Sequence, residues 1–380
     1  MNEHRQQSGD PQRNTTCIPA LGIFITLSTS NVLAAAELDW QALPDLPDKL
    51  GVAGPFVGVH KNALIVAGGA NFPRPVWDND KVWRDSIHVL TQTDDRYEWC
   101  DGGKLSRPTG YGAAVSTAGG VICIGGNNGE DTFTSVFALQ WNAATQQIVE
   151  VPYPSLPKPC AFGQAVLIGK IIYLAGGQNA GNLDTAMNNF WSLDLSDKTA
   201  PTKSAANTEP FSWKELPACP GGARAFNITA AQHNGYEDCV YIMSGRRQNG
   251  DNLDFLTDVW EYSPKSSQWR QRADVPQPVL AGIGIGFGQS HIYVLGGDDG
   301  SMFFRADELK DNHPGFPRES FAYHTITNTW TSTGTTPQNH VSTVPLIWNN
   351  RIVIASGEVR PRVRTPAVWS VRSVARKPDF

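Results

Sequence analysis

The densest group of reactive side chains in this sequence lies near its C-terminal end. The segment reads Gly357-Glu358-Val359-Arg360-Pro361-Arg362-Val363-Arg364-Thr365. A carboxylate beside guanidinium groups could transfer protons by general acid/base catalysis, because neighbouring charges tune its pKa. The same arginines could bind an anion through their paired N–H donors. The structural alternative is a solvated charged loop with surface ion pairs, and the residues alone favour neither interpretation.

Other polar residues follow apolar segments that end in two small residues. They are Asn71, Asn127, Asn128, Gln178, Asn179, Arg246, Arg247, Asp298, Asp299 and Glu358. Turns before the next apolar segment add Arg107, Lys158 and Arg224. Asn and Asp favour turns for local backbone reasons, whereas a guanidinium is not needed there. We predict that Arg224, Arg107, Asn71, Asn127 and Arg246 bind a polyhydroxylated or anionic small molecule.

An internal repeat predicts how these residues are positioned. A β-rich segment ending in two small residues occurs six times, and the second residue of each pair is Gly69, Gly126, Gly177, Gly245, Gly297 or Gly357. Their spacing is close to the kelch period of about 50 residues. A polar loop, an alternating strand and a further strand, mostly marked by Trp, follow each pair. The sequence therefore predicts an all-β, six-bladed kelch-type β-propeller whose loops converge beside a central channel.

Two local features of each repeat carry further predictions. The small pairs fit places where backbones crowd and φ turns positive. An outer-strand Trp should fill the wedge between neighbouring blades. The last repeat stops after its third strand, AVWSVRS, and LDWQALPDLP near the N-terminus supplies a strand without a blade. We expect the Trp40 strand to pair with the C-terminal blade and close the ring, which hides two sheet edges.

Two loops interrupt the repeat. Residues Lys198 to Pro210 are polar and rich in Pro and Ala, and we expect an excursion between the third and fourth strands of a blade. Residues Ser301 to Arg318 follow the fifth small pair, and FFRADELK within them could form a short helix. Because this segment would lie beside the channel, it is a candidate lid.

The N-terminal segment predicts export. Two arginines precede the apolar stretch IPALGIFITL, and Ala34-Ala35-Ala36 resembles a signal-peptidase site. We expect residues 1–36 to be a cleaved signal peptide, residues 37–380 to form one propeller domain, and the protein to be periplasmic or secreted. The apolar stretch is shorter than the roughly 20 residues that span a bilayer, and no later segment comes close.

Composition narrows the possible ligands. The formal net charge is −5, and no basic stripe accompanies aromatic pairs, so we expect no nucleic-acid partner. Five cysteines follow residue 36, and none has metal-ligand spacing. We interpret most of them as small buried apolar residues. We therefore expect no metal site, and pairing among the cysteines stays open.

Three segments resemble a known family. GEVRPRVRTPAVW is similar to GEAKPGLRTDAVF of the N-acetylneuraminate epimerases, which are periplasmic sialic acid mutarotases. GVAGPFVGVHKNALIVAGGANF resembles GVAGGFAGISNDSLIFAGGAGF, and CPGGARAF resembles FPGGPRDQ. The segments occur in a different order, as in the cyclically permuted mutarotase family, and the resemblance covers essentially the whole chain after residue 36. Arg362 stands where the family has glycine, and the loop after the fifth pair is shorter, which leaves the preferred sugar acid open.

The resemblance implies an activity and roles for individual residues. Glu358 would be the catalytic proton acceptor, Arg364 a catalytic electrostatic or substrate-binding partner, and Arg224 a substrate-binding residue. The reaction would interconvert anomers of N-acetylneuraminate or a related sugar acid by ring opening and closure, without a cofactor. The alternative is a non-catalytic kelch propeller that binds carbohydrate or protein. A copper oxidase ranks last, because the eight histidines lack the required grouping.

Overall fold

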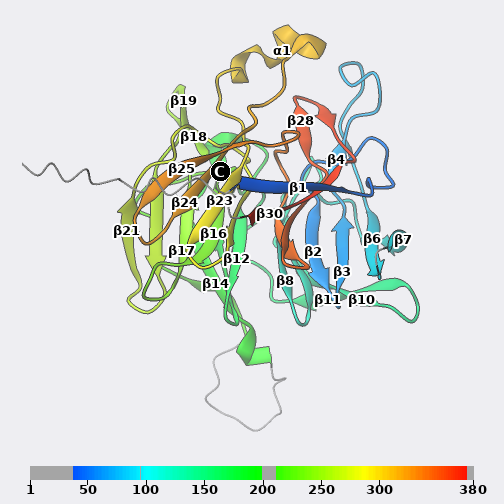
Figure 1. Cartoon of the computed structure of the whole chain (residues 1–380), viewed down its shortest axis with the longest axis horizontal. Helices are drawn as coiled ribbons and strands as arrows, with labels where there is room; N and C mark the ends of the chain where they lie inside the picture. The colour runs from blue at the N-terminus through cyan, green and yellow to red at the C-terminus, as the bar shows by residue number, and fades with distance from the viewer. Residues whose placement is uncertain (1–36, 95, 199–210, 375–380) are drawn as a thin grey trace, which may run out of the picture. The chain divides into compact units, whose positions relative to one another are not determined.

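The structure is a computed structural model that describes residues 37–94, 96–198 and 211–374, all within the compact unit Ala35–Phe380. In these ranges the chain forms six four-stranded antiparallel sheets, the blades of a β-propeller (Figure 1). The predicted fold is confirmed. The predicted signal peptide and nearly all of the Lys198–Pro210 excursion lie outside the described residues. No helix of the described part is long and apolar enough to cross a membrane.

Each blade begins with an inner strand that lines the propeller axis and ends with an outer strand. Blade 1 consists of β2 (Phe56–His60), β3 (Ala63–Ala67), β6 (Ser86–Thr93) and β7 (Arg96–Lys104). Blade 2 consists of β8 (Ala113–Thr117), β9 (Gly120–Ile124), β10 (Val136–Asn142) and β11 (Gln147–Tyr153). Blade 3 consists of β12 (Gln164–Ile168), β13 (Ile171–Ala175), β14 (Phe190–Asp194) and β15 (Lys214–Glu215).

The remaining blades follow the same order. Blade 4 consists of β16 (Ile228–His233), β17 (Asp238–Met243), β20 (Val259–Ser263) and β21 (Gln268–Arg272). Blade 5 consists of β22 (Gly284–Phe287), β23 (His291–Leu295), β24 (Glu319–His324) and β25 (Thr329–Thr335). Blade 6 consists of β26 (Leu346–Trp348), β27 (Arg351–Ala355), β30 (Val368–Val374) and β1 (Glu37–Leu43).

The N-terminal strand closes the ring, as predicted. Strand β1 pairs antiparallel with β30, and Trp40 stands opposite Val371. Figure 1 shows the blue β1 beside the red β30, although the two come from opposite ends of the chain. Arg351 on β27 reinforces the junction by donating a 3.0 Å hydrogen bond to Asp39 Oδ2. The closure leaves neither β30 nor β1 as an unpaired strand at this junction.

The six small pairs adopt the backbone conformation that the sequence predicted. Both residues of every pair have positive φ, including Ser244 (54°) and Ser356 (58°). A Cβ atom on Gly125, the first residue of the second pair, would lie 2.1 Å from the Cys160 carbonyl oxygen. Each pair therefore needs small residues, because the inter-blade turn passes directly over the end of the second strand.

Backbone hydrogen bonds join all six blades around the axis. One residue of each inter-blade turn donates its N–H to the carbonyl of the corresponding residue one blade earlier, with N···O distances of 2.5 to 2.9 Å. All six residues have φ between 49° and 66°. We call them the ring residues: Gly54, Tyr111, Phe162, Phe226, Ala281 and Ser342. The six bonds form a closed circle, so the positions of these side chains at the axis are fixed by the backbone.

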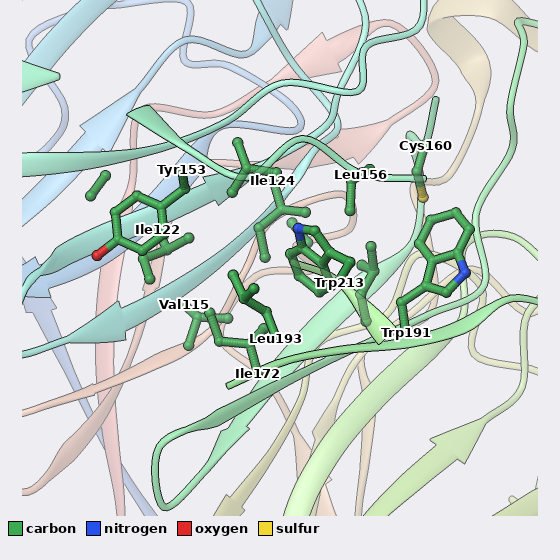
Figure 2. Close-up of a cluster of buried hydrophobic side chains, with 14 of the residues drawn as sticks. Val115, Ile122, Ile124, Tyr153, Leu156, Cys160, Ile172, Trp191, Leu193 and Trp213 are labelled. Carbon is green, nitrogen blue, oxygen red and sulfur yellow. The ribbon is translucent and has the colours of Figure 1, made fainter. Parts of the chain in front are cut away.

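Tryptophans in the outer strands or directly before them connect neighbouring blades, which confirms the prediction made for them. Each indole donates its N–H to a carbonyl in the turn after the previous blade's outer strand, over 2.8 to 3.1 Å. The pairs are Trp99 to Pro44, Trp213 to Pro154, Trp269 to Pro217 and Trp330 to Ala273. The space between blades 2 and 3 is filled by an apolar cluster that includes Trp191 and Trp213 (Figure 2).

Cysteines contribute to this packing and form no disulfide within the described ranges. Four of the five are buried, as expected, and Cys100 is half-buried. Burial raises the pKa of Cys160 to about 12, so its thiol stays protonated at neutral pH. The described residues contain no group of His, Cys, Asp or Glu side chains arranged to hold a metal ion.

Candidate active site

Loops that follow the small pairs build one face of the propeller. Three of these loops contain hairpins: β4 (Ala70–Asn71) with β5 (Val82–Trp83), β18 (Arg246–Asn249) with β19 (Asn252–Phe255), and β28 (Glu358–Arg360) with β29 (Val363–Arg364). Blade 3 carries η1 (Leu183–Thr185) in the same loop, and η2 (Leu195–Lys198) follows β14. Figure 1 shows β4, β18, β19 and β28 at one end of the blades, together with helix α1 (Ala306–Leu309).

The residue directly after each small pair is held in a fixed register. It forms a backbone bridge with the residue that precedes a ring residue. The six equivalent positions are Ala70, Asn127, Gln178, Arg246, Asp298 and Glu358. Arg246, Asp298 and Glu358 therefore belong to consecutive blades 4, 5 and 6. Convergence of these residues next to the axis follows from the repeat itself.

One carboxylate oxygen of Glu358 is held by its own hairpin, and the other is free. Oε1 accepts a 2.8 Å hydrogen bond from the backbone N–H of Arg362 and a 2.9 Å bond from Arg364 Nη1. Arg362 has a φ of 66°, which turns its N–H toward the carboxylate. Oε2 has no hydrogen-bond partner among the described residues. The free oxygen can accept a proton from a bound molecule.

Arg364 is the anchor of this arrangement. Its side chain is 3% exposed, and it also donates to the Ala70 carbonyl and to Tyr111 Oη, both over 3.3 Å. Burial lowers the pKa of Arg364, but the attraction of Glu358 and Tyr111 outweighs burial and raises its pKa overall. Arg364 therefore stays charged and fixes the orientation of the Glu358 carboxylate.

Arg246 lies in the same cavity without such partners. Its Cζ is 4.1 Å from the ring centroid of Phe226 and 4.8 Å from that of Phe303. Its Nε is buried and has no hydrogen-bond partner, and the described residues give its guanidinium no ion pair within 4 Å. Burial lowers its pKa to about 10, against the attraction of Asp298 and Glu358. The group is still charged at neutral pH, with donors available to an anionic ligand.

Aromatic ring residues form the floor below these side chains. The centroids of Tyr111 and Phe162 are 4.9 Å apart, and those of Phe162 and Phe226 are 4.5 Å apart. The other ring residues are small: Gly54, Ala281 and Ser342. The floor therefore covers one side of the axis with three adjacent rings, which is a surface suited to the apolar face of a sugar.

The cavity has two adjoining parts that share Phe226, Arg246, Ser342, Glu358 and Pro361. The first lies toward the 301–318 segment and is mostly apolar, with Met302, Phe303 and Phe316 in its wall. The second lies toward blade 1 and is rich in cations. It includes Lys81, Arg362 and Arg364. Glu358 and Arg246 thus stand where two chemically different spaces meet.

The 301–318 segment contains the predicted short helix. It comprises η3 (Phe303–Arg305), α1 and η4 (Lys310–Asn312). Phe316 donates its N–H to the Val359 carbonyl over 3.1 Å, and Arg360 forms a 2.9 Å ion pair with Asp311. These contacts attach the segment to the hairpin that carries Glu358. Its role as a lid stays a prediction.

Not all the predicted residues line the cavity. Glu358, Arg364 and Arg246 do, whereas Asn71, Asn127, Arg107 and Arg224 do not. Asn71 is fully buried, donates to Asp48 and Gly51, and accepts two bonds from Arg84. Asn127 accepts a bond from the Trp83 indole.

The two remaining arginines have partners of their own. Arg224 is 1% exposed and forms a two-bond ion pair with Asp258, at 2.9 and 2.8 Å. Arg107 is exposed, stacks 3.7 Å from the Phe133 centroid and donates to Ser135. The contacts of these four residues with other parts of the protein give each of them a structural role. A role in ligand binding stays a prediction for Arg224, Arg107, Asn71 and Asn127.

Sequence reasoning missed several lining residues. The three floor aromatics share a recognisable signal. Each lies two positions before the first residue of an inner strand, and a small residue precedes it directly: Gly110-Tyr111, Ala161-Phe162 and Ala225-Phe226. Lys81 offers no such signal, because it lies in the connection between β4 and β5, which is far longer than those of the corresponding hairpins in blades 4 and 6. Only the folded arrangement brings it to the cavity.

Known proteins resemble the chain in sequence and in fold. No protein-family model matches it. N-acetylneuraminate epimerase of Haemophilus influenzae (strain PittEE) is 27% identical over 258 residues, 61% of each chain. That of Yersinia pestis (strain Pestoides F) is 33% identical over 130 residues, covering 29% of this chain and 32% of the relative. That of Salmonella typhi is 23% identical over 240 residues, 57% of each chain.

The alignments therefore span less than two thirds of these relatives. Among solved structures, YjhT superposes with a TM-score of 0.62 and 16% identity, over 89% of this chain and 98% of that chain. At that identity the likeness shows the fold. The chain is thus a six-bladed β-propeller that is homologous to curated N-acetylneuraminate epimerases.

Proposed function

We propose that this protein is a sugar-acid mutarotase, an isomerase that interconverts the anomers of N-acetylneuraminate or a related sugar acid. One observation carries the proposal. A carboxylate with a free oxygen, Glu358, and a guanidinium that has no ion pair or hydrogen bond among the described residues, Arg246, line the same cavity. The first can move a proton, and the second can bind the carboxylate of the substrate.

Binding would begin at Arg246. A substrate carboxylate can accept two parallel N–H bonds from a guanidinium, and such charge-assisted bonds are stronger than neutral ones. The ligand would thereby satisfy donors that are otherwise unpaired. The apolar face of the sugar ring would then lie on the floor formed by Tyr111, Phe162 and Phe226. With the sugar held by these contacts, its anomeric hydroxyl can reach Glu358.

Chemistry would proceed by ring opening, rotation and reclosure. Glu358 Oε2 accepts the proton of the anomeric hydroxyl, and the electron pair of that O–H bond forms a carbonyl. The bond between the anomeric carbon and the ring oxygen breaks, and the ring oxygen takes a proton from protonated Glu358 or from water. After rotation about the carbon–carbon bond, the reverse steps close the ring on the other face. Protons balance over the cycle, and no redox step is required.

Arg364 would position the base. Its bond to Glu358 Oε1, together with the Arg362 N–H, fixes the carboxylate so that Oε2 is directed to the substrate. Arg364 is therefore a positioning residue in this scheme.

Anomer exchange of the wild-type protein tests the proposal. N-acetylneuraminate freshly released as a single anomer is followed by NMR, with and without the protein. We expect faster exchange with sugar acids and none above background with glucose, which lacks the carboxylate. Saturable binding without faster exchange would instead identify a non-catalytic carbohydrate-binding propeller.

Export of the protein is a separate proposal. It is supported by the arginines, the apolar stretch and the Ala34-Ala35-Ala36 site in the sequence. N-terminal sequencing of the protein recovered from its cells tests it. A mature chain that begins near Glu37 is expected, and an intact residue 1 in the recovered protein would contradict cleavage.

A further inference from the structure

Three cations surround one buried aromatic ring in the blade 1 part of the cavity. Lys81 Nζ, Arg362 Cζ and Arg364 Cζ lie 5.8, 4.9 and 4.8 Å from the centroid of Phe72. Phe72 is 9% exposed, so packing holds its ring in place. Each contact is weakly attractive, but the three like charges repel one another. We call Lys81, Arg362 and Arg364 the Phe72 cation cluster.

Protein carboxylates do not balance this cluster. Of the described residues that line this part of the cavity, Glu358 alone is acidic, and its bound oxygen is paired with Arg364. Arg362 donates to the Val76 carbonyl and stacks on Trp77, without an ion pair within the described ranges. Two of the three cations therefore lack an anionic partner.

Lys81 is held by aromatic rings alone. Its Nζ lies 5.3 Å from the Trp83 centroid and 5.2 Å from that of Tyr111. Among the described residues its ammonium has neither an ion pair nor a hydrogen-bond acceptor. The three N–H donors of Lys81 are consequently available to a ligand.

The cluster and Arg246 stand at opposite ends of the aromatic floor. Lys81 lies over Tyr111, Arg246 lies over Phe226, and the Phe162 ring separates these two rings. A sugar on the floor would thus have a positive group at each end. A sugar with one carboxylate satisfies Arg246 and leaves the cluster unneutralised.

We propose that the preferred substrate is a sugar acid that carries two anionic groups. One, the carboxylate, binds Arg246, and the second, a phosphate, sulfate or further carboxylate, binds Lys81 and Arg362. This inference rests on the proposed function for the sugar and deepens it by naming the substrate class. Lys81 is then a specificity-determining residue, because it contacts only the second anion.

Binding of paired ligands tests the inference. Calorimetry compares N-acetylneuraminate with two forms that carry a second anionic group, called dianions here for their two groups. They are its 9-phosphate, whose phosphate adds nearly two charges at neutral pH, and its α2,8-linked dimer, and they separate phosphate from carboxylate as the second anion. We expect wild-type protein to bind at least one dianion roughly 10- to 100-fold more tightly than the monoanion, the range for a charged hydrogen bond. Lys81→Met should abolish most of that ratio. Lys158→Met removes the same charge from an exposed turn outside the cavity and should preserve it.

Two results would overturn the inference: equal affinity of wild-type protein for the monoanion and both dianions, or equal weakening of all ligands in Lys81→Met. Anomer exchange measured on the same samples separates the two proposals. A Lys81-dependent preference without exchange would refute the mutarotase and uphold the second anion site. Exchange of the monoanion without any preference for the dianions would uphold the mutarotase and refute the second anion site. Failure of all three ligands to bind would overturn both.

Discussion

Glu358 and Arg364 face each other across the hairpin β28–β29, both as register partners and as an ion pair with 2.9 Å between Oε1 and Nη1. The turn that joins them also supplies the Arg362 N–H to the same oxygen. The orientation of the carboxylate is therefore set by a few neighbouring residues. The partner across the cavity, Arg246, comes from blade 4, and only the closed ring brings it near.

Replacing Arg246 should change binding and stability in opposite directions. Arg246→Met removes a guanidinium whose buried Nε has no hydrogen-bond partner among the described residues, but it keeps an apolar side chain between Phe226 and Phe303. We expect sugar-acid affinity to fall by about 10- to 100-fold. The free energy of unfolding should stay equal or rise by about 1 kcal/mol, because an unsatisfied buried group is lost. Calorimetry and urea unfolding measure the two effects. Unchanged affinity would exclude Arg246 from the binding site.

His340 should make stability depend on pH. It is 2% exposed, and its Nδ1 lies 2.8 Å from the Ser356 carbonyl. Burial lowers its pKa from 6.5 to about 4, against the raising effect of that contact. Between these pH values the unfolded chain binds the proton and the folded chain does not, so stability falls as pH falls. The full drop corresponds to roughly 3 kcal/mol.

The variant His340→Asn checks this prediction. An amide can still donate to the Ser356 carbonyl but does not titrate. Urea unfolding at several pH values between 4 and 7 should show a shallower pH dependence in the variant than in the wild type. Parallel curves for the two proteins would show that His340 is not the group responsible.

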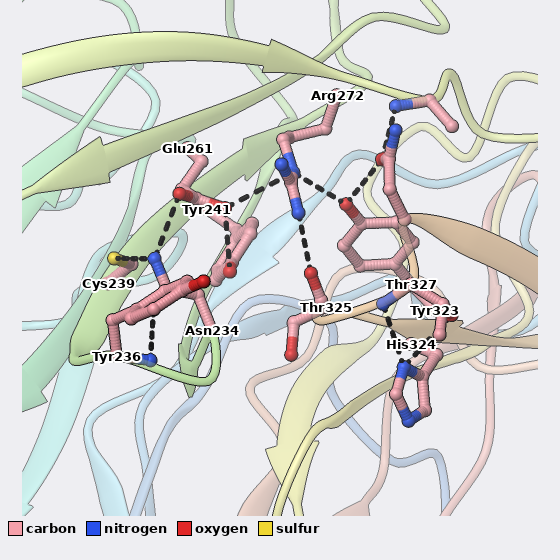
Figure 3. Close-up of polar contacts among 12 residues, drawn as sticks. Asn234, Tyr236, Cys239, Tyr241, Glu261, Arg272, Tyr323, His324, Thr325 and Thr327 are labelled. Atoms are coloured by element: carbon pink, nitrogen blue, oxygen red, sulfur yellow. Dashed lines mark hydrogen bonds and ion pairs between the residues drawn. The ribbon is translucent and has the colours of Figure 1, made fainter.

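A buried ion pair within blade 4, between β20 and β21, should be essential to stability in both its members. Glu261, 4% exposed, pairs with Arg272 over 3.2 Å and accepts bonds from Tyr241 and Asn234 (Figure 3). Arg272→Met leaves a buried carboxylate unpaired and should cost roughly 3–5 kcal/mol of unfolding free energy. Glu261→Gln combined with Arg272→Met should recover part of that loss.

An exposed ion pair provides the control for this measurement. Lys104 pairs with Asp85 over 3.2 Å, with the lysine side chain 72% exposed. Lys104→Met should change the unfolding free energy by less than about 1 kcal/mol. Similar losses for Arg272→Met and Lys104→Met would contradict the role assigned to burial.

Removal of strand β1 should damage stability and activity together. A chain that starts at Gly51 lacks the partner of β30 and the Asp39 carboxylate that Arg351 and Arg372 bind. Because blade 6 also carries Glu358, we expect a lower unfolding temperature and loss of anomer exchange. A chain that starts at Glu37 keeps β1 and is the control. Full activity of the shorter chain would contradict this dependence.

Much of the fold was predictable because its determinants are local and repeated. Six small pairs mark six places where the backbone must take positive φ, and all twelve residues do so. The last repeat lacks a fourth strand and the N-terminal segment supplies one, so the two ends complete one blade, in which Trp40 of β1 pairs with Val371 of β30. Position after the pair also identified Arg246 and Glu358, since the bridge to each inter-blade turn is part of the repeat.

The rest of the site depends on contacts that the repeat does not specify. Ala70 occupies the bridging position in blade 1, so Asn71 lies one residue further along the chain than Glu358 does in its blade. The side-chain amide of Asn71 donates to the Gly51 carbonyl and accepts from Arg84. Arg224 finds its carboxylate partner, Asp258, on a distant segment. Lys81 reaches the cavity from a long loop. Its sequence surroundings give no sign of the Phe72 ring or of Tyr111.

Anomer exchange by Glu358→Gln tests the central claim most directly. The amide oxygen can still accept bonds from Arg364 and the Arg362 N–H, so the variant should fold and bind the sugar acid, with an unfolding temperature lowered by the loss of the ion pair. It cannot accept the proton, and we predict that NMR will show an exchange rate at least about 100-fold below that of the wild type. Wild-type exchange rates in folded Glu358→Gln would contradict the account.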